Sequence, residues 1–593
     1  METPDVGIPR RLAERMSMAE QYEYLRARVV GRRTLVTAGA VAGGLLTGCS
    51  SPTAADARPA AATSRAPGSA VVPFGRHLAF GADPRTRMRI SWQVPSAVRR
   101  PYVRVGLRPD DLGRRIEAEV RALHTPGVPG VRLALEQYYA HAALDGLTPG
   151  TTYYYGVGHD GWDPAAPGHR AALASFRTAP TSPERFVFTA FGDQGVGRAA
   201  DANDDLVLRQ KPAFHLHAGD ICYANVNGSG RQQDGYDPGF WDLFLKQNEP
   251  VARSVPWMVT TGNHDMEAWY SPDGYGGQLA RFSLPDNGFD PHGTPGAYSF
   301  RYGNVGFVAL DANDVSYEIP ANLGHSGGRQ TAWLDRTLGG LRAADGVDFV
   351  VVFFHHCAYS TSQHASDGGV RAQWLPLFER HRVDLVINGH NHVYERTDAI
   401  RGGKVGRTVP VGGSTDPARD GIVYVTAGGG GRDLYAFPSG VEDSYEGHVT
   451  RHEAVETFHW AKGRDRAAET VEWSRVRYTG FSLLAVEARA GTSPRLAVSA
   501  LAQDGRRIDH FEVRRGGGVL AVGVARGGRV ADSAADGRLG HGNRLLRQTW
   551  STARGVTRRR RGRGAPAAGV ACTGPRLTTA IRWIERDVRL LPS

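Results

Sequence analysis

The chain of 593 residues has only 4 cysteines, only four lysines, and no apolar run in its middle that could cross a membrane. So few cysteines exclude a fold held together by a disulfide scaffold. The lack of a long apolar run excludes a membrane-spanning helix in the body of the chain. With lysine nearly absent, arginine supplies almost all of the 71 basic residues. This bias is typical of a GC-rich coding sequence and is weak evidence for nucleic-acid binding.

The formal net charge of +11 belongs to the C-terminal end of the chain. Residues 514–593 contain 17 arginines and 4 acidic residues, so the first 513 residues are close to neutral. Because this end is rich in Gly, Ala and Arg and has no periodic apolar pattern, we expect it to be disordered. A basic tail that binds anionic polymers is the functional alternative. We predict no specific nucleic-acid partner.

The N-terminus has the pattern of an export signal. Arg32 and Arg33 precede the apolar stretch Thr34–Leu46, which is too short to span a membrane but has the length of a signal core. The arginine pair resembles a twin-arginine signal, and Leu-Thr-Gly-Cys ending at Cys49 resembles a bacterial lipobox. Cys49 is therefore the expected lipidation site. We expect an extracytoplasmic protein, either held at the membrane surface by a lipid on Cys49 or secreted.

Two strand patterns divide the rest of the chain. From about Val71 to Thr178, short period-2 segments alternate with Pro/Gly turns, which favours a β-sandwich, and Leu144–Val157 resembles part of a fibronectin type III-like module. From Phe186, buried apolar runs end in polar clusters and alternate with helical stretches, as in α/β domains. The predicted organisation is an export signal (1–49), a flexible linker (50–70), an all-β domain (71–180), an α/β domain (185–513, with a strand-rich C-terminal part from about 420) and a tail (514–593).

Eight side chains that can carry metal or proton chemistry follow the apolar runs of the α/β region. They are Asp193, Asp220, Tyr223, Asn263, His264, His355, His390 and His392. Carboxylate and phenolate oxygens and imidazole nitrogens are ligands for hard or borderline metals. Each short motif alone also occurs in ordinary polar turns. All of them in this order, each after a strand-like run, indicate a metal site.

These blocks resemble those of the metallophosphoesterase superfamily. They read Gly192-Asp193-x-Gly195, Gly219-Asp220-x-x-Tyr223, Gly262-Asn263-His264-Asp265, His355 with Tyr359 four residues later, and Gly389-His390-x-His392. The tyrosine after the second aspartate is similar to that of purple acid phosphatases, and the extended blocks 220–225 and 390–396 are similar to their plant-type, large branch. The resemblance covers about Val71 to Val513. It implies a four-layer α-β-β-α sandwich preceded by a fibronectin type III-like domain.

The resemblance also implies a dinuclear metal centre bridged by Asp220. Its remaining ligands would be Asp193, Tyr223 and His392 for a ferric ion, and Asn263, His355 and His390 for a divalent ion (Fe, Zn or Mn). Phenolate and carboxylate suit Fe(III), whereas neutral amide and imidazole suit a softer divalent ion. Because His355 and His356 are adjacent, a strand lets only one of them face the metals. The family's spacing to Tyr359 favours His355 and leaves His356 a structural role.

The activity that the resemblance implies is an acid phosphatase that hydrolyses small phosphomonoesters by attack of a metal-bound hydroxide. Asn263 and His264 would bind the substrate, and His264 is the first candidate for the proton donor to the leaving group. His364, nine residues after His355, is the second candidate, with a solvent-exposed loop histidine as the alternative. Competing hypotheses are a phosphodiesterase of the same superfamily and a surface phosphate-binding protein without turnover.

Two further features lie beside these blocks. Cys222 and Cys357 are close in sequence to predicted ligands, and they are either inert buried thiols or a redox-sensitive pair. Gly428–Gly431 resembles a phosphate-cradling loop but lacks the following Lys-Ser/Thr. We interpret it as a tight turn near the site.

Overall fold

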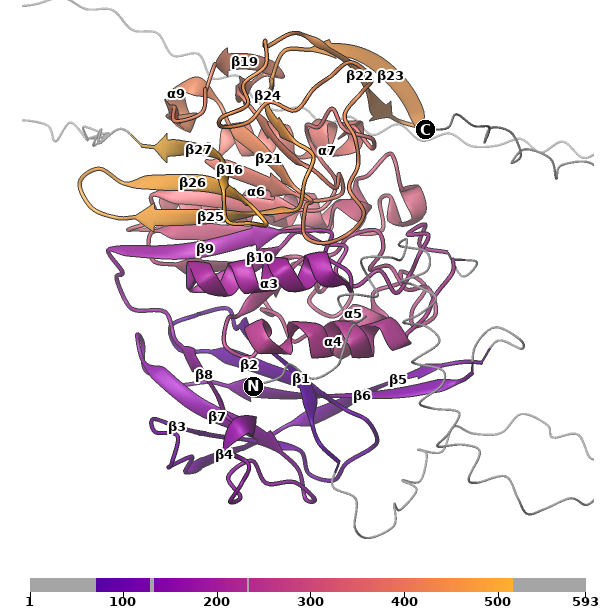
Figure 1. The fold of residues 1–593 in the computed structure, drawn as a ribbon, viewed down its shortest axis with the longest axis vertical. Helices are drawn as coiled ribbons and strands as arrows, with labels where there is room; N and C mark the ends of the chain where they lie inside the picture. The colour runs from indigo at the N-terminus through magenta and orange to yellow at the C-terminus, as the bar shows by residue number, and fades with distance from the viewer. Residues whose placement is uncertain (1–70, 128–132, 232–233, 516–593) are drawn as a thin grey trace, which may run out of the picture. The chain divides into compact units, whose positions relative to one another are not determined.

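The computed structural model describes residues 71–127, 133–231 and 234–515 (Figure 1). The chain divides into two units, Met1–Val519 and Leu520–Ser593. The second unit, the predicted export signal with Cys49, the linker and nearly all of the predicted tail lie outside the described residues. Among the residues that are described, no helix combines the length and the apolar character needed to cross a membrane.

The N-terminal domain is all-β, as predicted, apart from one short 3-10 helix. Two four-stranded antiparallel sheets, in the orders β1-β2-β6-β5 and β4-β3-β7-β8, enclose a core that includes Trp92, Val103 and Tyr155. The first sheet consists of β1 (Phe74–Phe80), β2 (Met88–Val94), β5 (Glu119–Thr125) and β6 (Leu135–Leu144). The second consists of β3 (Tyr102–Gly106), β4 (Arg114–Glu117), β7 (Thr152–Gly158) and β8 (Ala174–Arg177), with the 3-10 helix η1 (Arg170–Ala172) before β8.

Two seven-stranded sheets form the centre of the α/β domain, in the orders β11-β10-β9-β25-β26-β27-β20 and β12-β13-β14-β16-β21-β17-β24. The strands of the first are β9 (Arg185–Phe191), β10 (Phe214–His217), β11 (Trp257–Val259), β20 (Ser414–Thr415), β25 (Ser482–Arg489), β26 (Arg495–Ala502) and β27 (Arg507–Arg514). Those of the second are β12 (Tyr298–Tyr302), β13 (Val305–Ala309), β14 (Phe349–Phe354), β16 (Leu385–Asn388), β17 (Tyr394–Thr397), β21 (Val423–Ala427) and β24 (Ser474–Tyr478). Strands β9, β10 and β11 run parallel, as do β13, β14, β16 and β21.

Helices cover the outer face of each sheet, which confirms the four-layer α-β-β-α arrangement (Figure 1). Apolar side chains of both sheets, such as Phe188 and Phe307, meet in one core between them. Leu206 of α3 and Phe244 of α4 belong to a core on the outside of the first sheet, and Leu334 of α6 to one outside the second. These helices are α3 (Arg198–Gln210), α4 (Gly239–Ala252), α6 (Arg329–Ala343), α7 (Gly368–Gln373) and α8 (Leu375–Arg380).

Shorter elements complete the described part of the domain. They are α5 (Gly276–Arg281), α9 (Pro417–Asp420), the 3-10 helices η2 (Ala312–Asp314) and η3 (Pro320–Asn322), the hairpin β18 (Ala399–Arg401) and β19 (Lys404–Arg407), and a small sheet of β15 (Ser366–Asp367), β22 (Val455–Ala461) and β23 (Asp465–Val471). The β-domain contacts α4 through its strand β1. The Glu249 carboxylate of α4 accepts hydrogen bonds from the Gly75 amide (2.7 Å) and the Arg76 guanidinium (2.5 Å) of β1.

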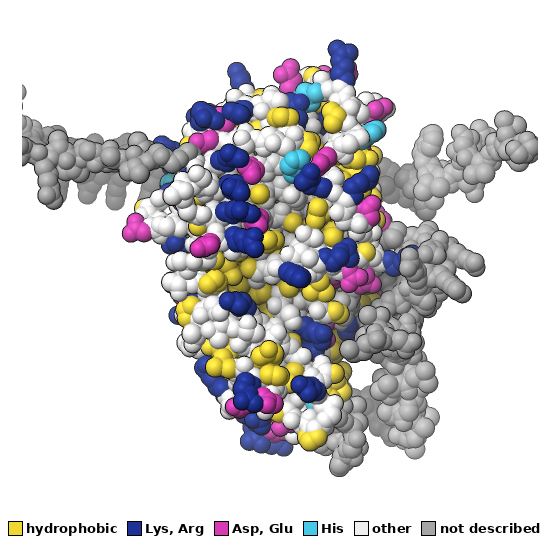
Figure 2. Space-filling view, turned by 60° about the vertical axis from the view of Figure 1, so that its left-hand side comes forward, with side chains coloured by type: hydrophobic (Ala, Val, Ile, Leu, Met, Phe, Trp, Pro, Cys, Tyr) yellow, Lys and Arg dark blue, Asp and Glu magenta, His cyan; other side chains and the backbone are white. Residues whose placement is uncertain are grey.

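The described surface carries acidic and basic side chains close together. Figure 2 shows a column of basic side chains with acidic ones beside it. Four arginines face one another in register across β9, β25, β26 and β27: Arg185, Arg489, Arg495 and Arg514. Directly opposed like charges destabilise a sheet, and two glutamates offset this repulsion. Glu487 pairs with Arg489 and lies 4.0 Å from Arg185, and Glu512 pairs with Arg495 and Arg514.

Candidate metal centre

The seven predicted metal ligands all lie where strands end. Asp193, Asp220 and Asn263 follow the parallel strands β9, β10 and β11, with Tyr223 in the loop after β10. His355 follows β14, and His390 and His392 follow β16 of the facing sheet. The carboxyl ends of parallel strands share one edge of a sheet. All seven side chains are buried.

The backbone at four of these residues adopts the left-handed conformation that side chains other than glycine rarely take. The φ angles are 62° at Asp193, 54° at Asp220, 60° at Tyr223 and 70° at His390. Such residues cost on the order of 1–3 kcal/mol each and gather at functional sites. The chain therefore turns sharply after its strands and directs these side chains toward one place.

One group of donor atoms consists of Asp193, Tyr223 and His392. The Tyr223 hydroxyl donates to Asp193 Oδ1 (3.1 Å) and lies 2.8 Å from His392 Nε2. His392 Nε2 lies 3.4 Å from Asp193 Oδ1. Burial and the carboxylates of Asp193 and Asp220 raise the pKa of Tyr223 well above its ordinary value, so a cation bound here must displace the phenol proton.

The second group consists of Asp220, Asn263, His355 and His390, and its centre is His355 Nε2. This nitrogen lies 3.0 Å from Asn263 Oδ1, 3.1 Å from His390 Nδ1 and 3.3 Å from Asp220 Oδ2. Asp193, Asp220 and His355 each contribute one donor atom to a further cluster. These three atoms lie within 4.8 Å of one another, which connects the two groups. The structure thus brings together, around Asp220, the two sets of side chains that the family resemblance implies as ligands.

In each of the three ligand histidines, one ring nitrogen forms a hydrogen bond away from the site, so the other ring nitrogen faces the site. His355 Nδ1 bonds to the Ala218 carbonyl (2.9 Å), and His392 Nδ1 to the Asp433 carbonyl (2.5 Å). His390 Nε2 bonds to the Glu318 carboxylate (2.8 Å). A carbonyl or carboxylate partner fixes the proton on that nitrogen, and metal-binding histidines are held in this way.

The charge of the site also suits cations. Burial by itself would lower the pKa of His355, but the carboxylates of Asp220 and Asp193 raise it to about 9. The buried carboxylates therefore favour positive charge at the position that a metal would share with them. The first group offers a carboxylate, a phenol and one imidazole, and the second a carboxylate, a neutral amide oxygen and two imidazoles, so the residues present fit a harder and a softer ion.

Both proposed proton donors lie at the margin of the donor atoms. The His264 amide donates to Asp220 Oδ1 (2.8 Å), and its ring lies 4.5 Å from that of Tyr223. His264 Nδ1 bonds to the Asn225 carbonyl (2.6 Å). The His364 ring lies 4.4 Å from the His390 ring. The two histidines therefore lie beside different ligands, His264 beside Tyr223 and His364 beside His390.

Four features lie next to the predicted ligands in sequence or in space: His356, the two cysteines and the glycine run. His356 is fully buried, and neither of its ring nitrogens has a hydrogen-bond partner, whereas His355 Nε2 faces three predicted ligands. Cys222 and Cys357 are both buried and free, and burial raises the pKa of each thiol, that of Cys357 to about 12. The glycine run packs under the site: a Cβ on Gly428 would come 2.9 Å from Asp193 Oδ2.

Three residues at the site belong to none of the motifs described above. Glu318 lies just before η3 and bonds to His364 and His390. Arg432 follows the glycine run, with its guanidinium carbon 4.7 Å from the centre of the Tyr223 ring. Tyr435 stacks on His392 at 3.9 Å. The position of Arg432 directly after a glycine run is a pattern that could have identified it from the sequence. No pattern in the sequence around Glu318 identifies that residue.

Comparison with known proteins identifies the two domains. Two family models match the chain: the purple acid phosphatase N-terminal domain over residues 73–178 and the calcineurin-like phosphoesterase over residues 187–394. An uncharacterized protein of Mycobacterium tuberculosis is 36% identical over 384 residues, which are 60% of this chain and 69% of the relative. Purple acid phosphatase 23 of Arabidopsis thaliana is 30% identical over 313 residues, 49% of this chain and 62% of the relative.

A solved structure shows the same fold. A purple acid phosphatase from yellow lupin (Lupinus luteus) seeds superposes with a TM-score of 0.56 over 75% of each chain, at 19% sequence identity. The N-terminal family model and the Arabidopsis relative are of purple acid phosphatases, and the second family model is of calcineurin-like phosphoesterases, with which the fold agrees. The chain therefore belongs to the purple acid phosphatases of the calcineurin-like phosphoesterase superfamily.

Proposed function

We propose that this metallophosphoesterase is an acid phosphatase that hydrolyses small phosphomonoesters. The observation that carries the proposal is the convergence of Asp193, Tyr223 and His392 in one donor group and of Asn263, His355 and His390 in another, with Asp220 reaching the second group and lying beside Asp193. Two cations held there would supply positive charge for a phosphate and would lower the pKa of a coordinated water.

The side chains around the two groups provide the remaining functions. His264 and His364 lie at the margin of the site, where either can hold a proton for the leaving group. Arg432 stacks on Tyr223 and adds a cation close to the first group, which favours an anionic substrate.

Hydrolysis of a chromogenic phosphomonoester and of the matching diester, together with metal analysis, tests this proposal. We expect two metal ions per chain, turnover of the monoester and little turnover of the diester. Preference for the diester would instead support the phosphodiesterase hypothesis. Two bound metals without turnover of either ester would support the phosphate-binding hypothesis.

A ferric ion at the first group predicts a coloured protein. We expect Tyr223→Phe to lose any visible absorption that arises from phenolate bound to iron, because phenylalanine has no oxygen to coordinate the metal. The absorption spectrum of the purified protein, with iron content measured alongside, checks this. Tyr435→Phe is the matched control: Tyr435 stacks on His392 but its oxygen is not among the first donor group. A coloured Tyr223→Phe protein would refute the ligand assignment.

We further propose that the protein is exported and lipidated at Cys49, on the basis of the twin-arginine-like and lipobox-like sequences. Expression in a bacterial host followed by membrane fractionation tests the anchor. We expect the full chain in the membrane fraction and Cys49→Ser in the soluble extracytoplasmic fraction. An equal distribution of the two proteins would contradict lipidation.

A further inference from the structure

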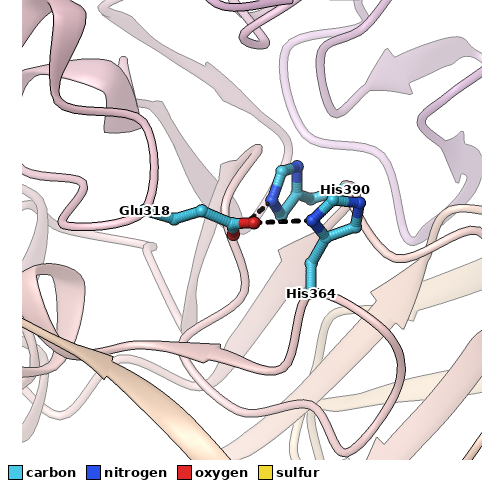
Figure 3. A group of neighbouring side chains, drawn as sticks. All are labelled: Glu318, His364 and His390. Atoms are coloured by element: carbon cyan, nitrogen blue, oxygen red, sulfur yellow. Dashed lines mark hydrogen bonds and ion pairs between the residues drawn. The ribbon is translucent and has the colours of Figure 1, made fainter. Parts of the chain in front are cut away.

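Glu318 connects a predicted metal ligand to a predicted proton donor. Its Oε1 lies 2.6 Å from His364 Nδ1, and its Oε2 lies 2.8 Å from His390 Nε2 (Figure 3). The side chain is buried, with 6% of its surface exposed, and both oxygens of its carboxylate have a histidine partner. Glu318 is therefore placed to act on both groups at once.

A carboxylate only accepts hydrogen bonds, so both histidines must donate to it. His390 then carries a proton on Nε2 and offers Nδ1, which lies 3.1 Å from His355 Nε2 in the second donor group. His364 likewise carries a proton on Nδ1, which leaves its Nε2 as the atom that can exchange a proton with a substrate. One ionised carboxylate thus sets the proton positions of two rings.

Several contacts hold this arrangement in place. The amides of Tyr317 and Glu318 both donate to Asp367 (3.0 and 3.2 Å to Oδ2), whose side chain also caps the N-terminus of α7. The His364 amide donates to Asn391 Oδ1 (2.8 Å), and the Trp460 indole donates to the His364 carbonyl (2.7 Å). The loop that carries Glu318 and the backbone of His364 are therefore fixed independently of any ligand.

We propose that Glu318 is a positioning residue: it orients His390 to bind the divalent ion through Nδ1 and holds His364 in place for proton transfer to the leaving group. The inference rests on the proposed function, because a leaving group exists only if the chain hydrolyses esters. The alternative use of the same three side chains is to hold a metal ion of their own, since their donor atoms lie within 4.8 Å of one another.

Glu318→Gln is the decisive variant because it keeps the size of the side chain. Each histidine bonds to a different oxygen of Glu318, and glutamine replaces one of these oxygens by an NH₂ group that only donates, so one of the two rings loses its acceptor. One ring must shift its proton or lose its hydrogen bond. Changes of this kind behind metal ligands cost roughly 10–100-fold in metal affinity or activity. We expect a loss of that size in the affinity for the divalent ion, in kcat, or in both.

The affinity is measured without turnover, by titrating metal-free protein with Zn²⁺ against a chromogenic chelator. Glu469→Gln is the matched control, because Glu469 also bonds to a histidine (His459 Nδ1, 3.2 Å) and to Arg371, outside the site. We expect its Zn²⁺ affinity to equal that of the wild type. Thermal unfolding of the metal-free proteins checks that Glu318→Gln is folded.

A double-mutant cycle separates the two roles of Glu318. With His364→Ala as background, Glu318→Gln should lower kcat by less than it does in the wild type, because the partner in proton transfer is already missing. Its effect on Zn²⁺ affinity should persist, since that effect passes through His390. Equal effects on kcat in both backgrounds would overturn the coupling to His364.

Two further outcomes would overturn the inference. One is a Glu318→Gln protein with wild-type Zn²⁺ affinity and wild-type kcat. The other is three metal ions in the wild type and two in the variant, which would mean that the three side chains hold an ion. If the proposed function is wrong, the result is different: the wild type binds metal but hydrolyses no ester. The Zn²⁺ titration then still tests the role of Glu318 at His390.

Discussion

Replacing Asp220 by Asn should abolish ester hydrolysis and lower the metal content below two ions per chain. Asp220 Oδ2 lies 3.3 Å from His355 Nε2, and Asp220 also shares a cluster of donor atoms with Asp193. Asparagine removes a negative charge from the point where the two donor groups meet, and its NH₂ cannot coordinate a cation. Metal ions supply several kcal/mol of transition-state stabilisation, so we expect a loss in kcat/KM on the order of 10³-fold or more.

Metal analysis and the monoester assay on the same preparation check this prediction. Asp286→Asn is the control, because Asp286 is exposed and outside the site. It should keep both metals and wild-type activity. If Asp220→Asn retained two metals and most of its activity, Asp220 would not join the two groups, and the ligand assignment would have to be redrawn.

Replacing Gly262 by Ala should disrupt the centre through crowding alone. A Cβ at this position would lie 2.1 Å from Asp220 Oδ1 and 2.3 Å from the Asp220 amide nitrogen. The backbone of Asp220 is fixed, because its amide and that of Ile221 donate to the Asp265 carboxylate (2.9 and 3.0 Å). The methyl group therefore has to displace Asp220 itself. Such overpacking costs typically about 1–3 kcal/mol of stability, and we expect loss of metal and activity as well.

Gly340→Ala provides the contrast in a helix. Nothing lies within 4 Å of a Cβ at Gly340, which is part of α6. Alanine there should stabilise the protein by roughly 0.5–1 kcal/mol, because glycine weakens a helix interior. Thermal unfolding and metal analysis compare the two variants. Wild-type stability and metal content in Gly262→Ala would show that the turn can relax and that its glycine is not required for the site.

The α/β region and its strand-end side chains can be predicted from the sequence for a simple reason. Apolar runs such as Phe349–Phe354 become strands buried on both faces, and the polar residue that follows, such as His355, must then leave the core at the sheet edge. The fold class and the family are confirmed. The assignment of each ligand to a metal, the choice of proton donor, and the export signal stay predictions.

The position of Glu318 at the site could not be predicted from the sequence. This residue lies in a loop after β13, with no apolar run or motif beside it, and it is brought to His364 and His390 by the anchoring of its loop on Asp367. Arg432 and Tyr435 reach the site in the same way, through the loop after β21. Such contacts depend on how loops pack, and neither the periodicity of apolar residues nor the spacing of motifs predicts loop packing.

The sequence by itself determined which side chains can hold cations and that they follow strands, because residue type fixes donor chemistry and apolar periodicity fixes burial. Only the tertiary structure decided which of them meet. The left-handed turns at Asp193, Asp220, Tyr223 and His390 and the facing of two sheets bring side chains from five strand ends into two groups. Neighbouring donor atoms within a group lie about 3 Å apart, and atoms of Asp193, Asp220 and His355 within 4.8 Å of one another join the groups. The same packing places Glu318 between His364 and His390. The sequence identified these two histidines only as separate candidates, a proton donor and a metal ligand.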